Sequence, residues 1–290
     1  MKFLFFAIVL SGMFFTSFAQ DSSLIYLWPG NVPGETAAKH PPEITGDHSG
    51  GVTRLTDVTN PSLTVFLPKT IHRNHAAVLV CPGGGYSILA INLEGYEIAR
   101  WLNHLGFTAF VLEYRVPNNR AGALQDVQRA MRIIRSRAKE WELDPEEIGV
   151  MGFSAGGSLS ARISTEYDHN WYKPVDAADT VSSKPDFTVL IYPAYLDEGP
   201  HHSLTPELTI NQDTPPAFIF QTADDPYGNS SLVMASALRN AKVPVELHIY
   251  PKGGHGYGLR PGNPAAEEWP PLAAEWLKSV IQNHHANYHL

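Results

Sequence analysis

The sequence predicts an α/β fold, a doubly wound and mostly parallel sheet flanked by helices. Short apolar segments rich in β-branched residues alternate with helix-length segments along most of the chain, and this alternation is typical of parallel strands joined by helical crossovers. Three distinctive stretches, at residues 81–86, 152–156 and 253–257, each follow an expected strand. Because ligands of such sheets bind at the carboxyl ends of the strands, we expect the three stretches to meet at one edge.

Strands are expected where a short apolar run is bounded by turn residues. In chain order these runs are residues 63–67, 76–80, 107–114, 148–151, 187–192, 216–222 and 244–250. Helices are expected where apolar residues recur three or four positions apart. They cover residues 94–105, 123–141, a stretch opening at 155, 229–241 and 268–284. The arginines of the second helix lie off its apolar stripe, so a solvated face is expected for Arg129, Arg132, Arg135 and Arg137.

The first 19 residues are expected to be a cleavable secretory signal peptide. A positive charge at Lys2 precedes an apolar run at 3–10, and the small residues Ser17 and Ala19 stand where such a signal is cut. The apolar run is shorter than the roughly 20 residues that a membrane span needs. We therefore expect cleavage after Ala19 and a secreted or periplasmic protein. The only cysteine, Cys81, excludes an internal disulfide and fits a buried small side chain.

Residues 20–290 are expected to form a single domain, because about 270 residues suit one α/β core. Residues 20–60, rich in Pro, Gly, Asp and Thr, are expected to be a loop-rich lead-in. The net charge is −8 without a basic cluster, which disfavours nucleic acid and anionic membranes as partners. A neutral polysaccharide or a small ester is compatible with this charge.

Residues 152–156, Gly-Phe-Ser-Ala-Gly, are the most informative part of the chain. A G-x-S-x-G sequence between a strand and a helix is typical of a nucleophile elbow. The glycines are needed because side chains there would collide with a serine held in so tight a turn. Such a turn presents Ser154 beside the N–H groups of the next helix. By itself, the pattern also fits a non-catalytic glycine-rich turn.

Two further stretches support the catalytic interpretation. Residues 81–86 read Cys-Pro-Gly-Gly-Gly-Tyr after an apolar run, and consecutive glycines let backbone N–H groups approach an anion closely, as in an oxyanion loop. His255 lies among glycines directly after the expected strand at 244–250, a setting that sets it apart from the other 12 of the 13 histidines. The histidines show no metal-ligand spacing, so no zinc site is expected.

Three aspartates compete to be the acid partner of the histidine. Asp224 and Asp225 leave one expected strand, and Asp197 leaves another. We favour Asp225, which directly precedes a proline, and Asp224 would then cap a loop or helix. The chain order Ser154, Asp225, His255 matches the Ser–acid–His order of α/β-hydrolases and differs from that of chymotrypsin and subtilisin.

Taken together, these stretches resemble the hormone-sensitive-lipase-like branch of the α/β-hydrolase superfamily. More narrowly, they are similar to secreted bacterial acetylxylan-esterase-like carbohydrate esterases, as are Leu-Trp-Pro-Gly at 27–30 and Leu-Glu-Tyr-Arg-Val-Pro at 112–117. The resemblance implies an oxyanion hole formed by the N–H groups of Gly84, Gly85 and Ala155. Where the family usually has a histidine before the glycines, this chain has a proline, so the support of the loop is expected to differ.

The expected function is ester hydrolysis through an acyl-enzyme, without a metal or organic cofactor. The resemblance implies removal of acetyl groups from plant polysaccharides such as xylan. A general short-chain carboxylesterase or feruloyl esterase is the first alternative, and a non-catalytic carbohydrate-binding protein on a hydrolase scaffold is the second. A prolyl-oligopeptidase-type peptidase would carry an additional propeller domain, for which the chain has no room.

The substrate pocket is expected to be shaped by the two longest irregular connections, residues 166–186 and 193–215. Aromatic side chains near the predicted site could stack on sugar rings or simply pack the loops. The candidates are Tyr86, Tyr195, Tyr227 and Tyr257.

Overall fold

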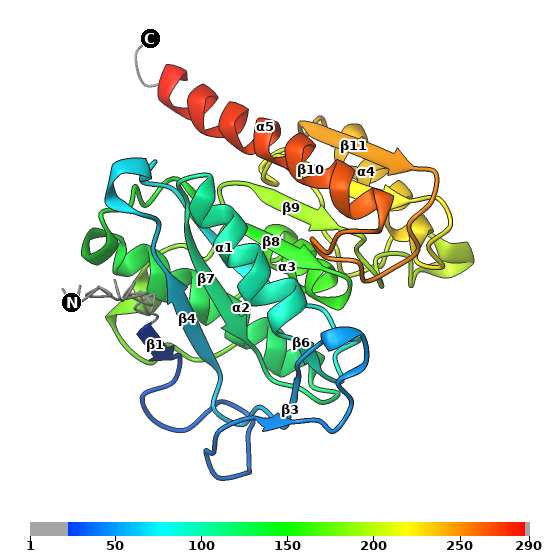
Figure 1. Ribbon diagram of the computed structural model, residues 1–290. Helices are drawn as coiled ribbons and strands as arrows, with labels where there is room; N and C mark the ends of the chain where they lie inside the picture. Colours follow the sequence, from blue (N-terminus) through cyan, green and yellow to red (C-terminus); the bar gives the residue numbers. More distant parts are fainter. Residues whose placement is uncertain (1–22, 288–290) are drawn as a thin grey trace, which may run out of the picture.

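An eight-stranded sheet runs through the middle of the computed structural model, which describes residues 23–287 (Figure 1). Across the sheet the order is β1 (Ser23–Tyr26), β4 (Ser62–Phe66), β7 (Thr108–Glu113), β5 (Ala77–Cys81), β8 (Ile148–Phe153), β9 (Thr188–Ile191), β10 (Ala217–Thr222) and β11 (Val245–Tyr250). The pairs β1–β4 and β4–β7 are antiparallel, and all strands from β7 to β11 are parallel. The predicted fold class is confirmed.

Helices cover both faces of the sheet. On one face lie α1 (Glu97–His104) and α5 (Pro264–Asn287), and on the other lie α2 (Arg120–Ser136), α3 (Ala155–Thr165) and α4 (Gly228–Asn240) (Figure 1). Helices α1 and α5 meet through Trp101 and Trp269, whose rings pack edge to face with centroids 5.1 Å apart. Every residue of the central strands β5 and β8 is buried, which explains why these strands appear in the sequence as continuous apolar runs.

Helix α2 begins three residues earlier and ends five residues earlier than its periodicity predicts. The Asn119 side chain accepts a hydrogen bond from the Gly122 N–H (2.8 Å) and caps the first turn. At the other end the chain leaves α2 and forms a short 3-10 helix at Ala138–Trp141. The apolar spacing continues through both segments, so it could not locate this boundary.

The expectation of a solvated arginine face is wrong for Arg129 and Arg132, which are only 2% and 5% exposed. Arg129 donates to the Leu27 carbonyl (3.0 Å) and forms ion pairs with Asp176 and Asp179. Both aspartates belong to the long connection 166–186, which packs against α2. Buried guanidinium groups require such partners, and partners so far away in sequence do not show in a helical pattern.

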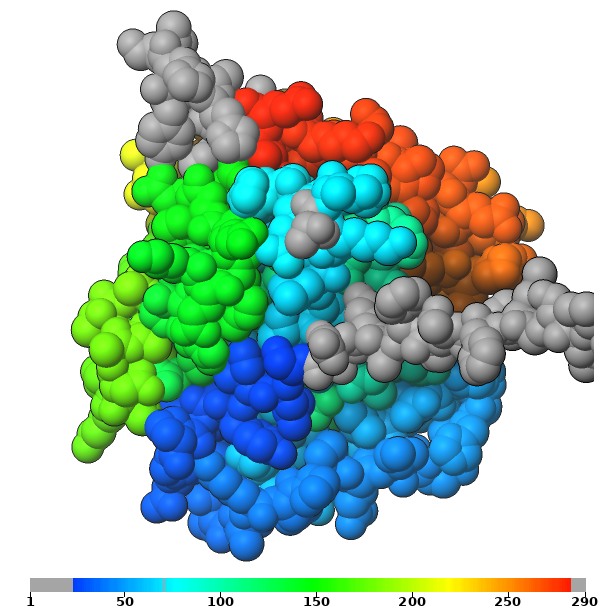
Figure 2. All heavy atoms as spheres, turned by 60° about the vertical axis from the view of Figure 1, so that its left-hand side comes forward, coloured from blue at the N-terminus to red at the C-terminus, as the bar shows by residue number. Residues whose placement is uncertain are grey.

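The N-terminal lead-in crosses the lower part of the face shown in Figure 2, in blue. It contributes β1 to the main sheet and two strands to a small second sheet, in which β3 (Arg54–Thr56) lies between β2 (Glu43–Ile44) and β6 (Leu89–Ala90). Pairing of β3 with β6 brings the lead-in toward the loop that follows β5.

The predicted signal peptide, residues 1–19, lies outside the described residues. Among the helices that the structure describes, none combines the length and the apolar character needed to cross a bilayer.

Candidate active site

The predicted site residues converge at the carboxyl edge of the parallel strands. Ser154 follows β8, Asp225 lies in the loop after β10, and His255 lies in the loop after β11. Parallel strands end at the same edge of a sheet, so residues separated by up to 101 positions can meet there.

The side chains of Ser154, His255 and Asp225 form an unbroken hydrogen-bonded chain. The Ser154 Oγ and His255 Nε2 atoms are 2.7 Å apart, and His255 Nδ1 lies 2.7 Å from Asp225 Oδ2. With the imidazole proton on Nδ1, the histidine donates to the aspartate and accepts from the serine. The Asp225 side chain is fully buried, and its other oxygen accepts the Tyr227 N–H (2.8 Å). The carboxylate is therefore held on both sides.

The two competing aspartates have other partners. Asp224 accepts hydrogen bonds from the N–H groups of Gly253 and Gly254 (3.0 and 2.9 Å). The bond from Gly254 has the larger effect on the pKa of Asp224, and both bonds lower this pKa from its ordinary value. Asp224 thereby stabilises the loop after β11 that carries His255, which we call the histidine loop. Asp197 accepts hydrogen bonds from Asn229 and Ser230 at the start of α4.

Ser154 has the strained backbone of a nucleophile elbow, with φ 52° and ψ −119°. A Cβ built on Gly152 would lie 2.1 Å from the Gly156 carbonyl oxygen, and one on Gly156 would lie 2.0 Å from the Cys81 carbonyl oxygen. The glycines are therefore required because α3 packs directly on β8 and on the end of β5.

Replacing Gly156 with alanine is expected to lower the free energy of unfolding by at least ~1–3 kcal/mol, because the new methyl group must push α3 away from β5. Gly46→Ala is a matched control, since a Cβ at Gly46 meets no atom within 4 Å. Urea unfolding of the two variants measures the difference. Equal midpoints would contradict the packing argument.

The predicted oxyanion hole lies beside the serine. Gly84 and Gly85 have φ values of +136° and +64°, which non-glycine residues rarely adopt, and Ala155 is the first residue of α3. Within residues 23–287, no protein group accepts a hydrogen bond from the N–H of Gly84 or Gly85. An N–H group in the first turn of a helix also lacks an intrahelical partner, so all three groups could receive an oxyanion.

A cleft of about 300 Å³ surrounds the serine. It is lined by residues from the lead-in, the oxyanion loop and the loops after β8, β9, β10 and β11, including Val52, Arg54, Leu93, Tyr195, Tyr227 and His255. Sequence reasoning missed Val52 and Arg54, because nothing local to the lead-in indicates that β3 pairs beside the oxyanion loop.

Two of the four candidate tyrosines line this cleft, and two do not. Tyr195 and Tyr227 form part of its wall, with the Tyr227 ring centroid 4.9 Å from that of His255. Tyr86 is only 2% exposed and packs beneath Tyr195. Tyr257 is 6% exposed and packs edge-on against Tyr192, with centroids 4.4 Å apart. The expectation that Tyr86 and Tyr257 face the substrate is wrong, because both rings are used to pack the loops.

The two long connections also behave differently. Residues 193–215 leave the carboxyl end of β9 and bring Tyr195 to the cleft, and they continue into an adjoining hollow of about 450 Å³. Residues 166–186 follow α3 and therefore start at the opposite edge of the sheet. In the described part of the chain this segment supplies no residue to the cleft, so the expectation that it shapes the pocket is wrong.

Glu94 is a site residue that sequence reasoning missed. It lies in a π-helical turn (Asn92–Tyr96) before α1, is 3% exposed, and accepts a hydrogen bond from the Gly83 N–H (2.8 Å). The sequence offered no distinguishing signal, because Glu94 begins an expected helix that also carries the charged residues Glu97 and Arg100. The Cys81 thiol lies behind the same loop, and burial raises its pKa to about 12, which leaves it protonated and non-nucleophilic.

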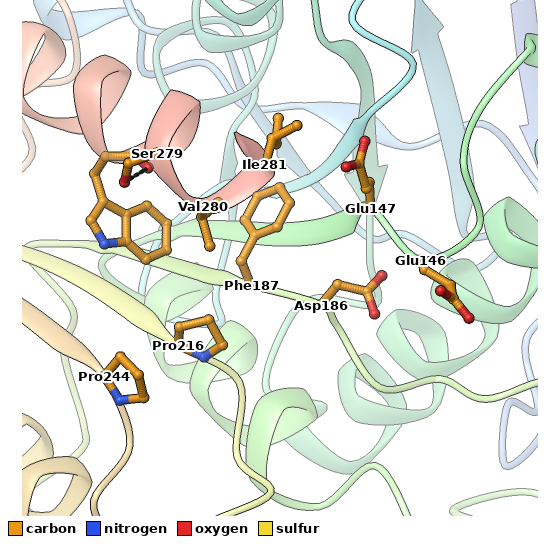
Figure 3. Close-up of a pocket in the computed structure, with 10 residues that line it drawn as sticks. Glu146, Glu147, Asp186, Phe187, Pro216, Pro244, Ser279, Val280 and Ile281 are labelled. Carbon is orange, nitrogen blue, oxygen red and sulfur yellow. Dashed lines mark hydrogen bonds between the residues drawn. The ribbon is translucent and has the colours of Figure 1, made fainter. Parts of the chain in front are cut away.

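A separate cavity of about 380 Å³ lies at the opposite edge of the sheet, where β8 to β11 begin. Figure 3 shows Phe187, Pro216 and Pro244 on one side of this cavity and the carboxylates of Glu147 and Asp186 on the other. It shares no residue with the triad. Among residues 23–287, no group of three or more His, Cys, Asp or Glu side chains is arranged to hold a metal ion.

Comparisons with known proteins place the chain among esterases. The family described as BD-FAE matches residues 63–192, which include the oxyanion loop and the serine. An acetylxylan esterase of Xylanibacter ruminicola is 33% identical over 252 residues, 78% of this chain and 50% of that protein. The chain thus spans about half the length of that relative.

Two further matches cover most of both chains. Carboxylesterase NlhH of Mycobacterium tuberculosis is 29% identical over 258 residues, 76% of this chain and 78% of that protein. The crystal structure of an acetyl ester-xyloside bifunctional hydrolase from Caldicellulosiruptor lactoaceticus superposes with a TM-score of 0.72 at 33% identity, covering 89% of this chain and 96% of that one. The chain therefore belongs to the α/β-hydrolase superfamily, within the acetylxylan-esterase-like and carboxylesterase-like group that these relatives represent.

Proposed function

We propose that the protein is a serine carboxylic ester hydrolase that removes acetyl groups from a plant polysaccharide such as xylan. The observation that carries the proposal is the chain of two 2.7 Å hydrogen bonds from Ser154 through His255 to Asp225. This arrangement activates a serine hydroxyl, which is a weak nucleophile without an adjacent base.

The reaction begins when His255 Nε2 takes the Ser154 proton and Oγ attacks the ester carbonyl carbon. Asp225, hydrogen-bonded to Nδ1, orients the imidazole and stabilises its cationic form. The N–H groups of Gly84, Gly85 and Ala155 stabilise the oxyanion. The imidazolium then protonates the departing alcohol, leaving an acetyl group on Ser154.

Water completes the cycle. His255 takes a proton from a water molecule, which attacks the acetyl-enzyme through a second tetrahedral intermediate. The imidazolium returns this proton to Ser154 Oγ as acetic acid leaves, and the acid then ionises in solvent. No step of this sequence requires a metal ion or an organic cofactor.

The residues around the site support a carbohydrate as the alcohol part of the ester. The cleft at Ser154 continues past Tyr195 and Tyr227 into the adjoining hollow, which is also lined by Asp197, Glu198 and His202. Aromatic faces and polar groups together suit sugar rings. The names of the Xylanibacter and Caldicellulosiruptor proteins, which include acetylxylan and acetyl ester-xyloside, support the same substrate class.

A general short-chain carboxylesterase is the second candidate, favoured by the match to the mycobacterial carboxylesterase over 76% of this chain. The two candidates differ in the alcohol that they require. They can therefore be separated with a single set of substrates.

Acetate release from acetylated xylan, measured beside hydrolysis of p-nitrophenyl acetate, butyrate and octanoate, tests the proposal. We expect release from the polysaccharide and a fall in kcat/KM as the acyl chain lengthens, with Ser154→Ala as the blank. Efficient cleavage of the p-nitrophenyl acetate and butyrate esters without release from acetylated xylan would favour the general short-chain carboxylesterase, and a preference for octanoate would contradict both candidates. Inactivity on every ester would contradict both candidates.

We also propose that the protein is exported, on the basis of the signal peptide that the sequence predicts at residues 1–19. N-terminal sequencing of protein from the periplasm or medium of an expressing bacterium should find Gln20 first. Retention of Met1 in an exclusively cytoplasmic product would contradict export.

A further inference from the structure

The most informative group that the mechanism does not use is the buried carboxylate of Glu94. A Cβ built on Gly83 would lie 2.6 Å from Glu94 Oε2 and 2.7 Å from Ser154 Cβ. The carboxylate and the nucleophile therefore border the same small space, the position that a side chain at residue 83 would occupy. Its Oε2 accepts the Gly83 N–H, which leaves the next two N–H groups of the loop for the oxyanion.

The other carboxylate oxygen leads to the histidine loop. Glu94 Oε1 accepts a hydrogen bond from the Tyr192 hydroxyl (2.9 Å), and the Tyr192 oxygen accepts one from the Gly258 N–H (3.0 Å). The Tyr192 ring also packs edge-on against His255, with centroids 5.1 Å apart. Tyr192 itself directly follows β9, with φ +40°. The Tyr192 side chain thus connects its own loop after β9 with the loop after β11, through Gly258, and with the loop after β5, through Glu94 and Gly83.

The hydrogen-bond pattern is complete only when Glu94 is ionised. The carboxylate accepts from both the Gly83 N–H and the Tyr192 hydroxyl. A protonated Glu94 would have to donate to the Tyr192 oxygen, and the tyrosine proton would then lose its acceptor. Burial raises the pKa of Glu94, and the hydrogen bonds from Tyr192 and Gly83 oppose this shift. Burial also raises the pKa of Tyr192, which keeps it a donor.

The oxyanion loop needs this support because of its own sequence. Pro82 stands where the resemblance places a histidine, and proline has no N–H to donate. In this structure the Pro82 carbonyl accepts a hydrogen bond from the Tyr114 hydroxyl (2.6 Å), and the next N–H, that of Gly83, is held by Glu94. Glu94 and Tyr114 thus hold the two sides of the Pro82–Gly83 peptide. The next peptide carries the Gly84 N–H, and its Gly83 carbonyl accepts a hydrogen bond from the Ala90 N–H (2.9 Å), so Glu94 acts on the oxyanion donors through the start of the loop.

We propose that Glu94 is a positioning residue that holds the oxyanion loop and the histidine loop in their catalytic arrangement through Gly83 and Tyr192. The proposal rests on the ester hydrolysis proposed above. It assigns to Glu94 no contact with substrate. Its effect is on the placement of the groups that stabilise the transition state, where a displacement of about 1 Å can cost roughly 10²-fold in rate.

Glu94→Gln tests this role with little change in volume. The amide can accept only one of the two hydrogen bonds, since its NH₂ group presents a donor to the other donor. We expect kcat for p-nitrophenyl acetate to fall by roughly 10- to 10²-fold with KM close to that of the wild type. Binding of a phenylboronic acid, which becomes tetrahedral on Ser154, should weaken by the same factor as kcat/KM.

Glu113→Gln is the matched control. Glu113 is also buried (7% exposed) and accepts hydrogen bonds from two hydroxyl groups, those of Tyr96 (3.2 Å) and Ser62 (3.3 Å). It lies on β7, and its partners are Tyr96, at the end of the turn that carries Glu94, and Ser62 on β4. Neither partner belongs to the loops that carry Gly83, Ser154, Asp225 or His255, so the variant should keep the wild-type kcat. Equal losses of kcat in the two variants, in step with equal losses of thermal stability, would overturn the positioning role.

Tyr192→Phe provides an independent test, because it keeps the carboxylate and removes the hydroxyl that links it to Gly258. We expect a similar loss of kcat, and no further loss when Tyr192→Phe is combined with Glu94→Gln. If Glu94→Gln does not fold, Tyr192→Phe alone decides the matter, and a wild-type kcat in that variant would overturn the proposal. A wild-type protein that hydrolyses no ester would overturn the proposed function, and the role of Glu94 with it.

Discussion

Ser154→Ala is expected to reduce kcat for p-nitrophenyl acetate by roughly 10⁴- to 10⁶-fold, the range found when one member of a catalytic triad is removed, with the nucleophile at its upper end. The remaining rate would come from substrate binding and the oxyanion hole. The loss follows from the geometry, because the Ser154 hydroxyl is the group hydrogen-bonded to His255 Nε2 at 2.7 Å. The alanine keeps the Cβ, so thermal unfolding should change little.

Ser158→Ala is the control for this variant. Ser158 lies one turn further along α3 and is fully buried, and it makes no hydrogen bond to the histidine. Its variant should retain activity within a few-fold of the wild type. Appreciable hydrolysis by Ser154→Ala, in protein free of wild-type contamination, would show that another group is the nucleophile.

Asp225→Asn is expected to reduce kcat by roughly 10⁴-fold, because an amide can donate to Nδ1 and so favours the wrong imidazole tautomer. In that tautomer Nε2 carries the proton and cannot accept one from Ser154. The histidine's position should change little, since the Asp225 side chain is fully buried beside it. Steady-state kinetics with p-nitrophenyl acetate measure the loss.

The adjacent aspartate gives a closely matched comparison. Asp224→Asn keeps an oxygen that can accept the N–H groups of Gly253 and Gly254, so only a few-fold effect is expected. If Asp224→Asn were the more damaging of the two variants, the assignment of the acid to Asp225 would be wrong.

The catalytic loops could be located from the sequence because their chemistry is local. A serine between two glycines, three consecutive glycines and a histidine among glycines each lie directly after an apolar strand. The parallel fold then brings such positions to one edge of the sheet. The sequence favoured Asp225 over Asp224 by its place before a proline, and the structure shows that Asp225 is the one hydrogen-bonded to His255. Two neighbouring aspartates in one loop differ mainly in the direction of their side chains, which the local sequence does not encode.

The residues that sequence reasoning misplaced are those whose environment is set by distant segments. Arg129 is buried because the connection 166–186 brings two carboxylates to it. Tyr86 is covered by packing against Tyr195, and Glu94 is buried where Gly83 and Tyr192 meet. In each case the partners lie at least eleven residues away along the chain, beyond the reach of a periodic pattern.

The sequence by itself determined the α/β class, the order of the strands along the chain and the three loops that carry Ser154, Asp225 and His255. These features depend on local backbone conformation and on hydrophobic periodicity, both of which are encoded within short stretches. Only the tertiary structure decided which tyrosines face the cleft, which aspartate meets the histidine, and that Glu94 lies against the oxyanion loop. Those outcomes depend on the direction of side chains at the contacts between loops, which forms only when the whole sheet has assembled.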